Sequence, residues 1–104
     1  MSDETVFEVV VFKARESVAT DDLVEAAAAV NEFISGQAGF IDRRLLRPVG
    51  EDAWVDVLRW TDLAAAEAAA GAAMESPVCG RFFGLIDADA DAMFHLRESF
   101  HHSA

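Results

Sequence analysis

The sequence predicts a single α+β domain with the element order β-α-β-β-α-β, and three observations lead to this prediction. The 104 residues match the usual length of one domain. Four runs are rich in β-branched and aromatic residues, which is typical of strands. Two alanine-rich segments with apolar residues at helical spacing lie after the first and the third of these runs.

The first strand is expected over residues 5–12, where Val and Phe predominate and no breaker occurs. Both of its faces are mostly apolar, which is typical of a strand covered on two sides, and Glu8 is the exception. The first helix is expected over residues 21–35. Thr20 is its predicted N-cap, carboxylates occupy its first turn, and Gly36 is a suitable stop.

A hairpin is expected next, with strands over residues 40–47 and 53–60 joined by a turn after Pro48. The first of these strands carries three arginines, including Arg44, which is typical of an edge strand. The second is apolar except for Asp56 and Arg59. A buried strand carries an aspartate such as Asp56 where its face meets a cavity, a partner or a ligand.

The second helix is expected to begin at Leu63, with Thr61 or Asp62 as its cap, and to end before Pro77. Pro77 can then begin a further helical turn. The last strand is expected over residues 90–97. The predicted core therefore spans residues 5–97, and residues 98–104 are expected to form a flexible tail.

This element order is that of the ferredoxin-like unit, in which right-handed crossovers give the strand order 4-1-3-2 and both helices lie on one face. The sequence analysis assigns a largely apolar set of residues to the other, open face: Val6, Val10, Phe12, Trp54, Leu58, Trp60 and Met93. A second copy of the sheet is the simplest cover, so the chain is predicted to form a homodimer in which two sheets enclose a barrel.

Composition limits the partners. Hydrophobic residues make up 53% of the chain, above the roughly 45–50% of typical domains, which favours burial on more than one side. The net charge of −11 argues against binding to nucleic acid or to an anionic membrane surface. No signal peptide, membrane span, metal-ligand set or nucleotide motif is evident, and Cys79 stands alone. A cytoplasmic protein without a metal is therefore expected.

Several short motifs, in this order and spacing, resemble one known family. They are Val9-Val10-Val11-Phe12-Lys13, Ala38-Gly39-Phe40, Trp60-Thr61-Asp62-Leu63-Ala64-Ala65-Ala66, Pro77 with Phe82-Phe83, and Met93-Phe94-His95. Over about residues 5–97 the chain resembles the dimeric α/β-barrel superfamily, specifically the antibiotic-biosynthesis-monooxygenase-like domains.

The resemblance implies a tight homodimer around a central cavity, and it leaves several activities open. Some relatives are cofactor-independent monooxygenases of polyphenolic or quinone-type substrates; others degrade haem, isomerise or decarboxylate small molecules, or have no known activity. The haem-degrading relatives use an Asn on the first strand, a Trp in the second helix and a His shortly after it. This chain has no Asn in strand one, alanines in that helix and Phe82 and Phe83 after Pro77, which argues against haem breakdown.

The candidate catalytic residues are Glu8, Asp56 and His95, which the predicted sheet places on one face of three adjacent strands. Neighbouring side chains at matching register lie about 5 Å apart. Such a cluster can remove a proton from a phenol or an activated C–H bond. The candidate substrate-binding residues complete the site: Trp54, Trp60, Phe12, Met93 and Arg44.

The alternative is that these charged groups pair with one another, with Arg44 or with Arg97 across the interface, and fix the register of the dimer. Two functions follow from the two interpretations. One is a cofactor-independent enzyme that acts on an aromatic or quinone-type molecule inside the barrel. The other is a non-catalytic ligand-binding or accessory domain of the same fold.

Overall fold

The structure, a computed structural model, describes residues 4–104. Its helices and strands follow one another as β1 (Val6–Phe12), α1 (Thr20–Ser35), β2 (Phe40–Leu46), β3 (Trp54–Trp60), α2 (Leu63–Ala73), α3 (Pro77–Phe83) and β4 (Ala92–Leu96), with a short 3-10 turn at Ala88–Ala90. The order β-α-β-β-α-β is as predicted, and the helical turn expected at Pro77 is the short helix α3.

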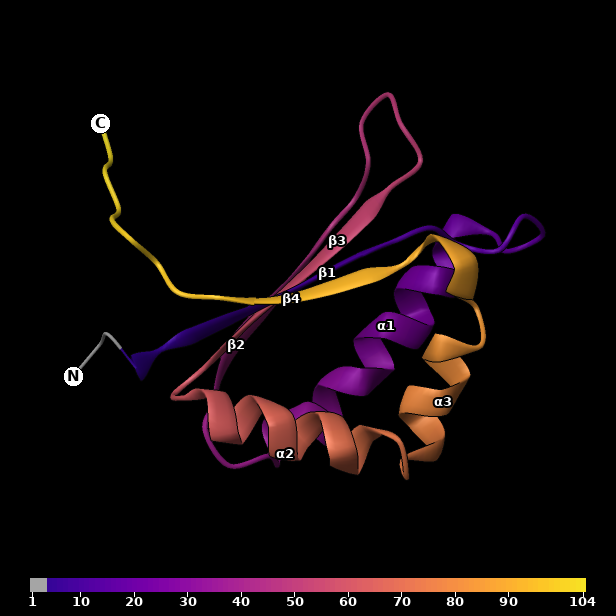
Figure 1. Cartoon of the computed structure of the whole chain (residues 1–104). Helices are drawn as coiled ribbons and strands as arrows, with labels where there is room; N and C mark the ends of the chain where they lie inside the picture. The colour runs from indigo at the N-terminus through magenta and orange to yellow at the C-terminus, as the bar shows by residue number, and fades with distance from the viewer. Residues whose placement is uncertain (1–3) are drawn as a thin grey trace.

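The strands form one antiparallel sheet in the order β2-β3-β1-β4, which is the predicted order 4-1-3-2 read from the other edge. Figure 1 shows all three helices on the same side of this sheet. The predicted ferredoxin-like fold is therefore confirmed. Beyond β4, residues 97–104 form no helix or strand and lead away from the helices (Figure 1).

The helix starts partly follow the predicted capping. The side chain of Asp62 accepts a hydrogen bond of 2.8 Å from the backbone N–H of Ala65 and so caps α2. Thr20, in contrast, is the first residue of α1, whose N-cap is Ala19 without a side-chain hydrogen bond. Gly39 has a φ of +84°, and a Cβ there would lie 2.5 Å from the Cβ of Ala65. This glycine lets the start of β2 approach the start of α2.

The predicted assignment of the two sheet faces is wrong. The residues expected on the open face include Phe12, Asp56 and Trp60, and these are buried under the helices at 0%, 5% and 1% exposure. Phe12 packs with residues of α1 and α3, and Trp60 packs with residues of α1 and α2. Strand alternation shows which residues share a face, but in β1 both faces are apolar, so alternation alone does not show which face the helices cover.

The open face carries the other half of each strand. Register places these residues opposite one another on it: Phe7, Val9, Val11, Val55, Val57, Arg59, Phe94 and Leu96. Phe94 and Leu96 are half exposed at 49% and 50%. Within residues 4–104, no helix has the length and apolar character needed to cross a membrane.

Candidate functional site

A cavity of about 450 Å³ lies between the sheet and the helices. Its walls are mainly apolar, with Phe33 from α1, Ala69 and Ala73 from α2, and Phe82 from α3 facing the sheet residues. It lies between two hydrophobic clusters, one beneath α1 and α3 and one beneath α2. A volume of this size is within the range of small-molecule sites, roughly 300–1,000 Å³.

Glu8 brings a carboxylate to the wall of this cavity from the middle of β1. Its Oε1 accepts a hydrogen bond of 3.1 Å from the indole Nε1 of Trp60. Burial raises the pKa of the Glu8 carboxyl above its ordinary value of 4.5, and the nearby Asp56 adds to the rise. His95, the Trp60 indole and Arg43 act in the opposite direction on this pKa.

His95 lies beside Glu8 on the neighbouring strand. The two residues are register partners of β1 and β4, and the Nε2 of His95 lies 3.9 Å from the Oε1 of Glu8. This distance is too long for a hydrogen bond but allows an ion pair when the imidazole is protonated. Because β4 is an edge strand, the His95 side chain is 28% exposed, and it does not line the cavity.

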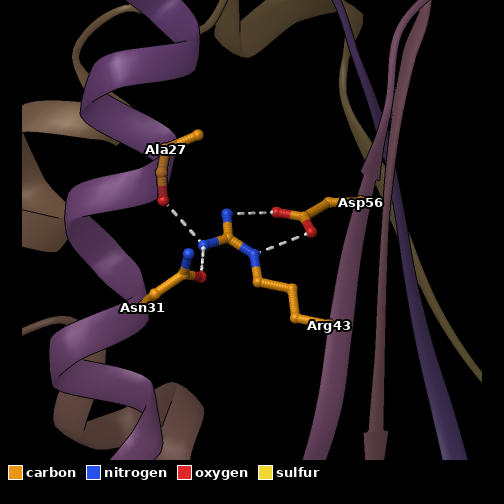
Figure 2. Close-up of polar contacts among 4 residues, drawn as sticks. All are labelled: Ala27, Asn31, Arg43 and Asp56. Carbon is orange, nitrogen blue, oxygen red and sulfur yellow. Dashed lines mark hydrogen bonds and ion pairs between the residues drawn. The ribbon is translucent and has the colours of Figure 1, made fainter.

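Asp56 is bound on both oxygens by Arg43. The Nε and Nη2 of Arg43 donate hydrogen bonds of 2.9 and 2.7 Å to the Asp56 carboxylate. The Nη1 of Arg43 donates to the backbone oxygen of Ala27 at 2.7 Å and to the Oδ1 of Asn31 at 2.9 Å. Figure 2 shows the guanidinium spanning the space between the sheet and α1. The Arg43–Asp56 ion pair is buried, with both side chains 7% exposed, and it joins two strands to a helix.

Five of the eight predicted site residues line the cavity: Glu8, Phe12, Asp56, Trp60 and Met93. Trp54 is buried beside the cavity and stacks on Phe12, with ring centroids 6.3 Å apart, but it is not a lining residue. His95 contacts Glu8 from the side of the sheet edge.

The predicted placement of Arg44 beside these residues is wrong. Arg44 is the register partner of Val57, so it lies on the open face, where it lines a second groove with Phe7 and Arg59. The residue that meets Asp56 is its neighbour Arg43. The pairing of β2 with β3 is irregular between Phe40 and Asp42, and residue alternation in the sequence does not reveal such an irregularity.

The structure also adds residues that the sequence analysis did not select. Asn31 of α1 accepts a hydrogen bond from Arg43, and Phe33 of α1 lines the cavity. Helical periodicity predicts which side of α1 faces the sheet. It does not reveal where helix and sheet separate enough to leave a cavity.

No protein-family model and no curated relative matches the sequence. Solved structures do match. A monooxygenase from the gene ActVA-Orf6 of Streptomyces coelicolor, in complex with the ligand nanaomycin D, has a TM-score of 0.77 at 19% identity, covering 98% of this chain and 94% of that chain. SnoaB, a cofactor-independent oxygenase from Streptomyces nogalater, has a TM-score of 0.72 at 21% identity, covering 95% and 99%.

The chain therefore shares its ferredoxin-like fold with these two structures. The resemblance seen in the sequence motifs is therefore confirmed at the level of the fold. The same fold also occurs in a haem-degrading protein from Mycobacterium tuberculosis, with a TM-score of 0.67 at 20% identity over 96% of this chain and 97% of that chain. Fold similarity at these identities does not select one reaction, so the function must be argued from the cavity.

Proposed function

We propose that the chain is a cofactor-independent, monooxygenase-like enzyme that oxidises an aromatic or quinone-type small molecule in the cavity between the sheet and the helices. The observation that carries this proposal is the position of Glu8. Its carboxylate lies at an otherwise apolar wall, receives one hydrogen bond from Trp60, and has a neighbouring imidazole in His95. A carboxylate in such surroundings is a stronger base than one in water because burial raises its pKa.

The proposed chemistry begins with proton removal. Glu8 takes a proton from a phenol or from an activated C–H bond of the bound substrate, and the resulting anion supplies electrons to O₂. For an anthrone the balance is simple. The CH₂ group loses both hydrogens and becomes a carbonyl, one oxygen atom of O₂ enters that carbonyl, and the other leaves as water. The substrate is the reductant and O₂ is the oxidant, so the reaction needs no further redox group.

Trp60 and His95 act through Glu8 as positioning residues. The Trp60 indole fixes one oxygen of the carboxylate, which leaves the other free to meet the substrate. His95 lies between Glu8 and the exposed edge of the sheet, where it can pass the proton on to solvent. Asp56, one of the predicted catalytic residues, is given a different role here because Arg43 binds both of its oxygens. It holds Arg43 in place.

Haem breakdown is less well supported by the cavity. Among the described residues 4–104, no histidine lines the cavity, so this lining offers no imidazole to ligate a haem iron. The mainly apolar lining and the Glu8 carboxylate suit an organic substrate that is oxidised directly.

The proposal includes a homodimer. The open face of the sheet is supported as its interface by the half-buried or exposed apolar residues of β1, β3 and β4. Stacked sheets bury such faces against each other. In this arrangement the cavity belongs to one subunit, and the dimer interface lies on the opposite side of the sheet.

Oxygen consumption with anthrone tests the enzymatic proposal. We expect quinone formation above the spontaneous rate, with O₂ consumed in equal amount. Glu8→Gln keeps the shape of the side chain but removes the base, so the rate should fall about 100-fold or more, the usual contribution of a general base. Glu32→Gln, a matched change on the exposed side of α1, should leave the rate unchanged.

Full activity in Glu8→Gln would contradict the assigned base. Tight binding of aromatic probes without any turnover would instead support the alternative, a non-catalytic ligand-binding domain.

A further inference from the structure

The charges around the cavity are unbalanced. Within residues 4–104, its lining includes three carboxylates, those of Glu8, Asp56 and Asp91, but only one basic side chain, that of Arg43. The other arginines and Lys13 do not line it. A cavity that bound an organic anion would be expected to present at least one free cation or several unpaired N–H donors.

The guanidinium of Arg43 already forms hydrogen bonds within the protein. Four hydrogen bonds leave Arg43: two to Asp56, one to the Ala27 carbonyl and one to Asn31. A guanidinium has five N–H groups, so four of them are engaged by the protein itself. The side chain is 7% exposed and its geometry is fixed from both the sheet and α1. An anionic ligand could recruit it only by displacing Asp56 or Asn31.

The remaining polar wall accepts hydrogen bonds rather than donating them. The Trp60 indole N–H is used by Glu8, and Glu8 presents carboxylate oxygen to the cavity. A ligand hydroxyl can donate to this oxygen, whereas a ligand carboxylate would meet like charge in a cavity with mainly apolar walls. Phe12, Phe33 and Phe82 supply apolar contacts for a flat ring system.

We infer that the cavity selects uncharged, hydroxyl-bearing aromatic ligands and rejects the same ring systems when they carry a carboxylate. This inference rests on the proposed site, since it concerns what the same cavity binds. It goes beyond the proposed function because it excludes ligands that carry a carboxylate, which the fold alone does not exclude. The physical cause is specific to this chain: the buried Arg43 is bound by Asp56, Ala27 and Asn31, and the Glu8 carboxylate lies at the cavity wall.

A matched pair of ligands tests the selection against carboxylates. A dihydroxyanthraquinone carboxylic acid and its methyl ester have the same rings and hydroxyls, and neither has a CH₂ group to oxidise. Calorimetric titration at pH 7.5 should show the ester binding at least tenfold more tightly, which is about 1.4 kcal/mol. Equal affinity, or tighter binding of the acid, would overturn the charge selection while leaving the site in place. If neither compound binds, both the selection and the proposed site are wrong.

Two variants test which charged group causes the difference in affinity between the ester and the acid. Glu8→Gln should bring the ratio of the two affinities below about threefold, because it removes a negative charge from the cavity wall. Asp56→Asn should release part of the Arg43 guanidinium and strengthen binding of the acid. Because Asp56→Asn also disturbs a buried ion pair, the folding of this variant is checked by circular dichroism. If Asp56→Asn is unfolded, the result with Glu8→Gln alone tests the charge selection. Glu32→Gln removes the same charge far from the cavity and should leave the ratio unchanged; an equal drop there would contradict a local cause.

Discussion

The two faces of the sheet are similar in apolar content but differ in how their charged residues are held. On the helix side, Arg43 and Asp56 form a buried ion pair with each side chain 7% exposed. On the open side, Arg59 and Asp42 form a pair with 38% and 40% exposure, and Arg59 holds the pKa of the Asp42 carboxyl below its usual value. Each pair is bidentate.

The difference shows which face of the sheet the chain covers with its own helices. The buried pair is tied further to α1 through Ala27 and Asn31, so the helix layer closes around it. Within residues 4–104, no third group forms a hydrogen bond with the side chains of the Arg59–Asp42 pair, which lies beside apolar side chains such as Phe7 and Val57. A substrate site therefore fits the side of the sheet that the helices cover, and a protein interface fits the open side.

The largest expected effect comes from breaking the buried pair. Arg43→Ala leaves Asp56 charged and uncompensated beneath α1, so the free energy of unfolding should fall by about 3–5 kcal/mol. Arg81→Ala breaks an exposed pair with Glu25, whose side chains are 54% and 73% exposed. That control should cost about 0–1 kcal/mol. Urea denaturation measures both, and equal losses would contradict the special role of the buried pair.

The next effect concerns the open face. Val57→Asp places a charge at the centre of the predicted dimer interface, and the dimer dissociation constant should rise at least 100-fold, or about 2.7 kcal/mol. Val49→Asp makes the same change at a hairpin position that is 91% exposed and should leave the dimer intact. Sedimentation velocity compares the two variants. A wild-type protein that remains monomeric at high concentration would remove the interface from the account.

The pH dependence of stability reports on the ionisation of Glu8, which lies on the side of the sheet that the helices cover. Because burial raises its pKa in the folded protein, ionisation of Glu8 disfavours folding. The stability associated with the protonated group is complete below about pH 4.5 and is lost as pH rises through the higher, folded-state pKa. Glu8→Gln should therefore gain stability relative to wild type between pH 4 and pH 7. A constant difference between the two proteins across this range would show that the carboxyl is not perturbed.

The smallest expected effect is a shift in a pH profile. His95 lowers the pKa of Glu8, so His95→Ala should move the acid limb of the pH–rate profile to higher pH. A purely structural role for His95 would lower stability and leave the profile in place. Oxygen consumption measured from pH 4 to pH 8 separates these outcomes.

The fold was largely predictable because its signals are local. Period-two apolar runs, the Asp62 cap and the Pro77 break placed most elements within two residues of their positions in the structure. Element order and crossover handedness then gave the sheet order. Alternation also placed Glu8, Asp56 and His95 on one face, as the register shows.

The part that could not be predicted depends on packing between layers. Phe7, Val9 and Val11 are as apolar as the residues on the other face of β1, so no local signal showed which side the helices cover. The cavity arises where alanine-rich α2 and the Phe side chains of α3 fail to fill the space above the sheet. Arg43 was missed because its partner Asp56 lies on the next strand at a diagonal position.

The position of the bound ligand relative to the sheet distinguishes a site beneath the helices from a site between two subunits. Three consecutive residues of β1 allow this distinction: Val10 lines the cavity, whereas Val9 and Val11 point to the open face. Methyl resonances of labelled valine and alanine can be followed while the dihydroxyanthraquinone ester is added. We expect shifts at Val10 and Ala73, with little change at Val9 and Val11. Shifts at Val9 and Val11 with none at Val10 would place the ligand between subunits and contradict the proposed site.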